Sequence, residues 1–209
     1  MEDVEDCDDL TYYNGLLYYL NFIKKVVVIC DIRTSLVVQQ IHLPDSCGEH
    51  CRFYFVGSSE ELLLFAGRLC PNSKEIMGFN AFQLDQSSRK RSEVKNLGGQ
   101  TIFLSKLSSI SLLASNHPRT KPNCIYFLPS HVKKHYKVFS LKDDSIEDFP
   151  LDAKFYGEYS WQQIWFTPSR CGRDVCKELF LLLYSVKSFV LGFTTYIYPK
   201  LPDGMAKCE

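Results

Sequence analysis

A strand–turn–strand unit that recurs about every 50 residues is the feature that most constrains the fold of this 209-residue chain. Three copies align with one another, centred on residues 28–32, 80–84 and 137–141. Each copy follows an apolar run and leads through a polar turn to a short strand-like segment, which ends at Leu43, Leu97 or Leu151. Repeats of this length are typical of β-propeller blades, which bury their faces only by stacking on neighbouring blades. The sequence therefore predicts an all-β fold, a partial β-propeller of about three kelch-like four-stranded blades.

The predicted blades occupy residues 11–169, between an acidic, disordered N-terminus (1–10) and an apolar C-terminal extension (170–209). Propellers usually close with four to eight blades, so three blades suggest either part of a longer product or a form that needs a partner. A β-sandwich would also give many short strands, but it does not explain the repeated unit. We favour the propeller.

A β-hairpin is predicted over residues 121–146. Its first arm, 121–127, is rich in β-branched and aromatic residues, and its second arm, 136–141, alternates apolar and polar residues up to a Lys-Asp-Asp-Ser turn. Such runs, separated by polar connections, indicate paired antiparallel strands.

The apolar segment 179–198 is long enough to span a bilayer. Lys187 interrupts it, however, and a central lysine costs on the order of 3 kcal/mol on insertion. We therefore expect a covering element or a poorly structured extension, and we keep a membrane anchor as the alternative.

The overall charge argues against nucleic acid as a partner. Lys and Arg number 24, Asp and Glu also number 24, and the pI is near 6.9. A nucleic-acid-binding surface normally shows as a basic excess. The short basic clusters at 89–91 and 133–135 are interpreted as solvated turns.

Nine cysteines are present, without a secretory signal at the acidic N-terminus, so we expect reduced thiols in the cytoplasm and/or the nucleus. Two groupings could suggest a metal: Cys47, His50 and Cys51, and the pair Cys171 and Cys176. Neither grouping has the spacing of a zinc knuckle. We predict no metal site.

No motif for catalysis or cofactor binding is recognisable. The chain has no phosphate-binding glycine loop, nucleophile elbow or paired-histidine motif. His42, His50, His117, His131 and His135 are interpreted as surface or core residues, and Trp161 and Trp165 as packing residues. We therefore predict a non-enzymatic protein and assign no catalytic, cofactor-binding or metal-binding residue.

Several segments resemble the plant F-box-associated family with a KIB-type β-propeller. The most specific are Pro122 and Asn123 followed by Ile125, Tyr126 and Phe127, and the late run Trp-Phe-Thr-Pro-Ser at 165–169. Segments 97–104, 111–115 and 138–146 add to the likeness, which covers about 12–169. A family Asp is replaced here by Gln100.

The resemblance implies a protein-interaction role. Members typically join an F-box, which docks on an SKP-type adaptor of a cullin-RING (SCF-type) ubiquitin ligase, to a propeller that holds the protein to be ubiquitinated. Residues 1–10 are too short for an F-box, so we expect the substrate-binding half of this design, with the adaptor recruited only by another route. The alternatives are a membrane-tethered protein anchored by 179–198 and a degenerate fragment without a biochemical role.

Overall fold

The computed structural model describes most of the chain up to residue 150. It describes residues 7–150, except 22, 45–46, 48–49, 59–60, 86–89, 106–108, 118–119 and 130–134, together with the backbone of three strands within 161–197. The described strands form four separate sheets, and all but the third are antiparallel throughout.

The first sheet is a four-stranded meander of β1 (Cys7–Tyr13), β2 (Leu16–Asn21), β3 (Val26–Asp31) and β4 (Leu36–His42), in that order. The turn from β1 to β2 has Asn14 at φ 46° and Gly15 at φ 82°. Positive φ at both central residues is what a tight two-residue hairpin requires, and Asn-Gly is the pair that best tolerates it. Because β1 begins at Cys7, the predicted domain boundary at residue 11 falls within a strand.

The second sheet repeats this plan with β5 (Cys51–Gly57), β6 (Leu62–Leu69), β7 (Ile76–Asp85) and β8 (Lys90–Val94). Lys90 and Arg91 are the first residues of β8, where they pair with Asp85 and Leu84 of β7. The interpretation of the 89–91 cluster as a turn is therefore wrong for these two residues. Three of the five residues of β8 are charged and three are exposed, as is usual for an edge strand.

The third sheet has five strands instead of the predicted four. It contains β9 (Gln100–Leu104), β10 (Ile110–Leu113), β11 (Cys124–Phe127), β12 (His135–Ser140) and β13 (Ser145–Pro150), in the order β10-β9-β11-β12-β13. The predicted hairpin is confirmed, because β11 pairs antiparallel with β12. The extra strand arises because a short 3-10 helix, η2 (Ala114–Asn116), follows β10, and β11 then returns parallel to β9.

Asn123 holds this return in place. It lies in the left-handed region at φ 57°. Its N–H donates to the carbonyl of Gln100 at 2.9 Å, and its side-chain Oδ1 accepts a hydrogen bond from the N–H of Leu97 at 2.8 Å. The N–H of Leu141 donates to its carbonyl at 3.2 Å. One residue thus joins the segment before β9 to the start of β11 and the end of β12.

A fourth sheet is formed by β14 (Trp161–Phe166), β15 (Phe180–Ser185) and β16 (Thr195–Ile197). The predicted apolar segment 179–198 therefore contains two strands, and its other residues lie outside the described part of the chain. Within the described residues, no helix has the length and apolar character needed to cross a membrane.

The second sheet is buried on both faces. One face carries Phe53 and Phe55 and packs against Leu20 and Ile29 of the first sheet. The opposite face carries Val56, Leu63 and Phe65, which pack in one cluster with residues of the third sheet such as Ile102, Ile125 and Phe127. In a β-sandwich each sheet faces the core on one side only, whereas an interior propeller blade faces a neighbour on both. This packing contradicts the sandwich and agrees with the propeller.

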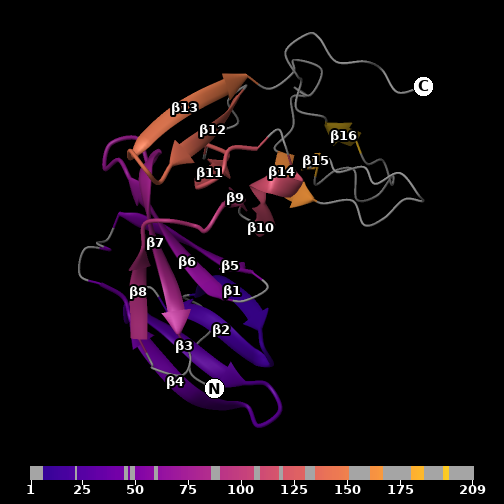
Figure 1. The fold of residues 1–209 in the computed structure, drawn as a ribbon. Helices are drawn as coiled ribbons and strands as arrows, with labels where there is room; N and C mark the ends of the chain where they lie inside the picture. The colour runs from indigo at the N-terminus through magenta and orange to yellow at the C-terminus, as the bar shows by residue number, and fades with distance from the viewer. Residues whose placement is uncertain are drawn as a thin grey trace, which may run out of the picture.

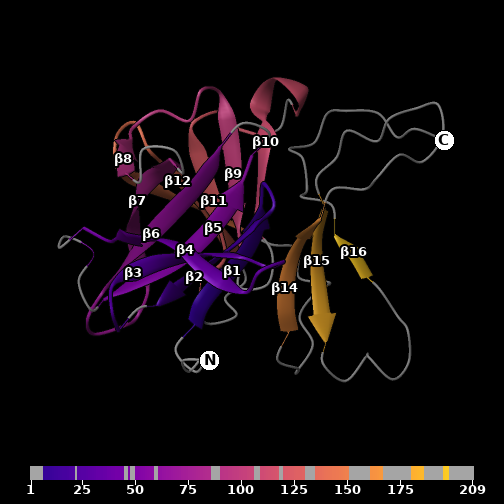
Figure 2. The same cartoon turned by 90° about the horizontal axis from the view of Figure 1, so that it is seen from below.

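Three sheets therefore stack in sequence order as an arc (Figure 1). The strand β5 contacts both β1 and β10, so the first strand of the second sheet meets its neighbours on either side. The view from below places β3 and β4 in front of β5 and β6, with β11 and β12 behind them (Figure 2). The three aligned repeat segments lie in β3, β7 and β12, each the strand next to the outermost one. The repeat seen in the sequence is thus a repeat of blade positions.

Candidate interaction surface

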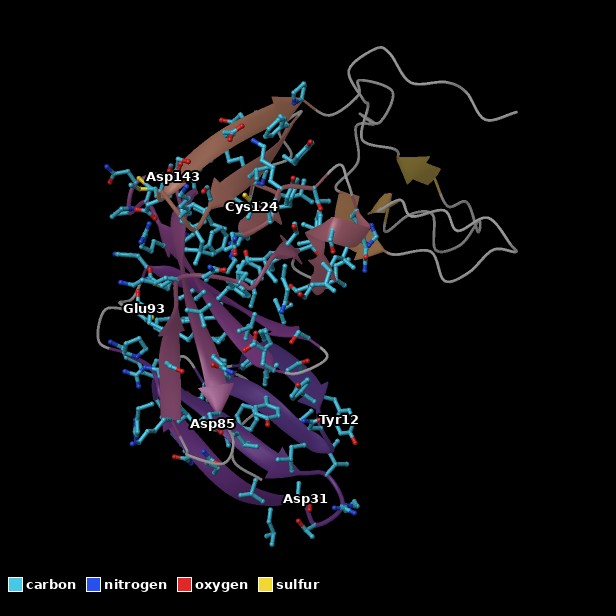
Figure 3. The ribbon with its side chains drawn as sticks, in the orientation of Figure 1. Tyr12, Asp31, Asp85, Glu93, Cys124 and Asp143 are labelled. Carbon is cyan, nitrogen blue, oxygen red and sulfur yellow. The ribbon has the colours of Figure 1, made fainter. Side chains whose placement is uncertain are left out.

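A groove of about 580 Å³ lies between the outer strands of the first and second sheets. We call it the rim groove. Its lining comes from the end of β4 and the residues just after it, and from β7 and β8: Gln40, Ile41, His42, Pro44, Asn80, Phe82, Lys90, Arg91 and Glu93. Figure 3 labels Glu93 on β8, at the outer rim of the second sheet.

The rim groove has an apolar floor and polar walls. Ile41 and Phe82 are buried and belong to the core cluster between the first two sheets, so the floor is a continuation of that core. Gln40, His42, Lys90 and Glu93 are exposed along the walls. A concave apolar surface with a few convergent polar groups is the usual form of a binding site.

A hydrogen bond crosses the rim groove. The guanidinium of Arg91, on β8, donates from Nη1 to the backbone carbonyl of His42, on β4, at 2.5 Å. Lys90 is next to Arg91 and Glu93 is two residues further along the strand, so the second-sheet wall carries two cations and one anion. The cations lie at the end of the groove that also holds His42.

Arg68 of the second sheet joins that sheet to the third at the surface. Its Nη2 lies 2.6 Å from a carboxylate oxygen of Asp144, in the turn between β12 and β13, and its Nη1 donates to Asn80 at 3.3 Å. The guanidinium lies against the backbone of Gly78, where an added Cβ would meet Nη2 at 2.0 Å. Asp143, labelled in Figure 3, is next to the paired Asp144 in the same turn.

The third sheet carries a row of aromatic rings across four strands. Phe103 stacks on Tyr126 with ring centroids 4.6 Å apart, Tyr126 on Tyr136 at 6.1 Å, and Tyr136 on Phe149 at 5.3 Å. Lys121 ends the row, with its Nζ 5.4 Å from the centre of the Phe149 ring and 2.7 Å from a carboxylate oxygen of Glu147. Burial raises the pKa of Tyr126 and Tyr136, so both phenols stay protonated.

Comparison with known proteins identifies the family to which this arrangement of sheets belongs. The sequence-family model described as the KIB1-4 β-propeller matches residues 1–156, about three quarters of the chain. The chain belongs to the KIB1-4 β-propeller family.

A curated relative supports the same family. It is the Arabidopsis thaliana protein named "Putative F-box protein At3g25750", which is 27% identical over 156 residues. The alignment covers 68% of this chain and 41% of the relative, so the chain spans less than half of that protein's length. The plant F-box-associated resemblance stated from the sequence is confirmed at the level of the family. Family and relative together support a protein-interaction module.

The predicted absence of a metal site concerned two cysteine groupings. Cys47 is buried, Cys51 is partly buried beside it, and His50 is exposed. Burial raises the pKa of the Cys51 thiol. Within the described residues, no three potential ligands gather around one point. Cys171 and Cys176 lie outside the described residues.

The histidines are spread over the KIB1-4 propeller. His42 lines the rim groove, His50 is exposed, and His135 begins β12 with Nε2 3.7 Å from Asp148. His117 follows η2, whereas His131 lies outside the described residues, as do the side chains of Trp161 and Trp165. The structure brings none of the described histidines together with another.

The rim groove is the feature that the sequence analysis missed. Lys90 and Arg91 were attributed to a solvated turn because a local basic cluster is usually one. The signal that could have found the groove is the contrast between the charged segment 90–94 and the uncharged segment 36–41, which the structure shows to lie in the outer strands of neighbouring sheets.

Proposed function

We propose that this chain is a substrate-binding propeller of the kind carried by F-box subunits of SCF-type ubiquitin ligases. The match of residues 1–156 to the KIB1-4 β-propeller carries the proposal, and the name of the Arabidopsis relative supports the link to F-box proteins. Residues 1–156 match a propeller, so the proposal assigns the binding of a protein partner to them and leaves the adaptor to an F-box elsewhere.

The geometry of the described residues supports recognition of a protein partner. The rim groove presents buried apolar side chains beside exposed cations and one carboxylate, a combination suited to a polypeptide. The arc of sheets holds this groove between two neighbouring blades. A non-enzymatic role therefore remains our proposal for this chain.

An affinity capture tests the proposed function. The 209-residue chain would be used as bait in native plant extract, with the SKP-type adaptor and cullin scored alongside all captured proteins. We expect one or a few recurrent proteins, and we expect them to bind a Phe65→Asp variant poorly because that buried side chain packs the second sheet against the third. Recovery of chaperones alone would contradict the proposal.

A ligase role needs a second readout. When this chain is expressed in plant cells with an F-box joined upstream, captured partners should become ubiquitinated and should accumulate on proteasome inhibition. If partners bind the chain but their turnover never changes, it is an interaction module outside the ubiquitin system.

We also propose that the protein acts in the cytoplasm and/or the nucleus. Fractionation followed by alkaline carbonate extraction should leave it in the supernatant. Retention in the membrane pellet would favour the alternative of a membrane-tethered protein anchored by residues 179–198.

A further inference from the structure

The outer edge of β4 presents backbone hydrogen-bonding groups to the rim groove, among them the carbonyl of His42 that accepts the bond from Arg91. In the pairing of β3 with β4, His42 lies opposite Val26, and the N–H of Leu43 donates to the carbonyl of Lys25 at 2.8 Å. In an antiparallel ladder, this bond between Leu43 and Lys25 means that the next pair, His42 and Val26, is not hydrogen-bonded. The N–H and C=O groups of these two residues point away from each other. The backbone groups of His42, and of Gln40 two residues earlier, therefore point away from β3 toward the groove.

The hydrogen bond from Arg91 agrees with this orientation. Its Nη1 reaches the carbonyl of His42 from the second sheet, so that carbonyl must face across the groove. The N–H of His42 and both backbone groups of Gln40 belong to the same edge. These backbone groups have the spacing that a neighbouring strand needs in order to form hydrogen bonds with β4.

The second sheet provides a surface beneath this edge. Phe82 and Glu93 lie opposite each other in the pairing of β7 with β8, and both line the groove with Asn80. A segment placed beside β4 would therefore have Phe82 below it and would extend the first sheet by one strand.

The outer edge strands of the first three sheets differ in how well charged side chains protect them from pairing with other chains. β13 carries Glu147 and Asp148, and β8 carries Lys90, Arg91 and Glu93. By contrast, β4 has no Asp, Glu, Lys or Arg, and Leu36, Val37 and Val38 are 63%, 53% and 47% exposed. Natural sheets place charges on free edges to prevent pairing with other chains. An uncharged apolar edge next to a groove is the exception that β-strand addition uses.

We propose that β4 binds an extended segment of a partner protein, which adds to the first sheet as a fifth strand in the rim groove. The segment has β-branched or aromatic residues that pack on Phe82 and an Asp or Glu at the end near Lys90 and Arg91. This inference rests on the proposed function and specifies how the same module recognises its partner. Backbone pairing supplies affinity, and the two cations select the acidic residue.

The test uses a phage-displayed library of random nonapeptides selected on the 209-residue chain. We expect enriched peptides to have apolar residues alternating with polar ones and to contain an Asp or Glu near one end. Amide hydrogen exchange then locates the bound peptide. A synthetic enriched peptide should slow exchange at Gln40 and His42, and leave Ile41 nearly unchanged because its N–H already faces β3.

Two variants test the contacts separately. Arg91→Glu should weaken binding of the acidic peptide at least tenfold, with Lys142→Glu, an exposed lysine in the turn after β12, as the matched charge-reversal control. Gln40→Pro removes an N–H that faces the groove, so the sheet should keep its internal bonds while peptide binding falls about tenfold. Circular dichroism spectra would verify that both variants fold.

The outcomes separate this inference from the proposed function. Peptides that bind both variants as tightly as the parent chain, or that protect no amide of β4, would overturn the strand addition. A concentration-dependent dimer that protects the same amides would also overturn it, because a second copy would then be the occupant. If extract proteins are captured equally by the parent chain, Arg91→Glu and Gln40→Pro, the interaction module stands and this site does not.

Discussion

Asn123 shows at the scale of one residue why a short motif marks this family. Its left-handed backbone and its side-chain bond to the N–H of Leu97 both hold β11 parallel to β9. Asn tolerates φ > 0 better than other residues that have a side chain. The Pro-Asn pair was recognised from the sequence as a family signature, whereas its role became visible only in the hydrogen bonds.

Substitutions at Asn123 should separate its two contributions. Asn123→Ala should lower the free energy of unfolding by about 2 kcal/mol, because it adds backbone strain to the loss of a hydrogen bond. Asn123→Gly should cost about 1 kcal/mol, because glycine removes the strain but not the lost bond. Urea unfolding would measure both, and equal losses in the two variants would contradict this division.

Gln39 is a residue whose replacement should stabilise the chain. Its Nε2 is buried and has no hydrogen-bond partner in the described portion of the molecule. The residue pairs with Ile29, which belongs to the core between the first two sheets. Gln39→Leu should therefore raise the free energy of unfolding by about 1 kcal/mol. Gln40→Leu, on the opposite face of β4, is the control; an equal gain there would indicate a general effect of hydrophobicity.

Two cysteines should differ in reactivity because their thiols have opposite pKa shifts. Hydrogen bonds from Ser73, and from the backbone of Asn72 and Ser73, lower the pKa of Cys70, whereas burial raises the pKa of Cys124. Below the ordinary pKa of a cysteine thiol, a larger fraction of Cys70 than of Cys124 is therefore thiolate. Iodoacetamide should label Cys70 before Cys124. Peptide mass spectrometry across a pH series would measure the rates. Ser73→Ala should move the Cys70 profile to higher pH, and an unmoved profile would contradict the assigned cause.

At the scale of elements, the ion pair between Arg68 and Asp144 joins the second sheet to the third but should contribute little stability. The two side chains are 40% and 64% exposed, so water and salt screen their attraction. Asp144→Asn keeps a side chain that tolerates φ 55° and removes the charge. We expect a loss below about 1 kcal/mol that disappears in high salt. A larger, salt-independent loss would mean that the turn itself depends on the carboxylate.

The strands were predictable from the sequence wherever local pattern determines them. The alternation of apolar and polar residues predicted the hairpin of β11 and β12. Residues 1–10 were expected to be disordered, whereas β1 begins at Cys7. The parallel insertion of β9 was not predictable, because it depends on where the chain returns after η2. The rim groove was not predicted either, since it is lined by residues of two neighbouring sheets, from β4 on one side and from β7 and β8 on the other. The apolar-polar period of a single strand does not specify how far that strand lies from a neighbouring sheet.

The whole molecule depends on stacking, and truncation should show which sheets are required. Residues 1–96 contain the first two sheets but leave Val56, Leu63 and Phe65 without the third. Residues 1–150 retain the first three sheets and the clusters on both faces of the second. We therefore expect the 1–150 chain to unfold cooperatively on heating, and the 1–96 chain to bind the dye ANS and aggregate, because a blade with one bare face exposes its core. Thermal unfolding and ANS fluorescence of both truncations and of the full chain would measure this. If 1–150 binds as much dye as 1–96, residues beyond 150 complete the core, and the C-terminal strands are a required blade of the propeller.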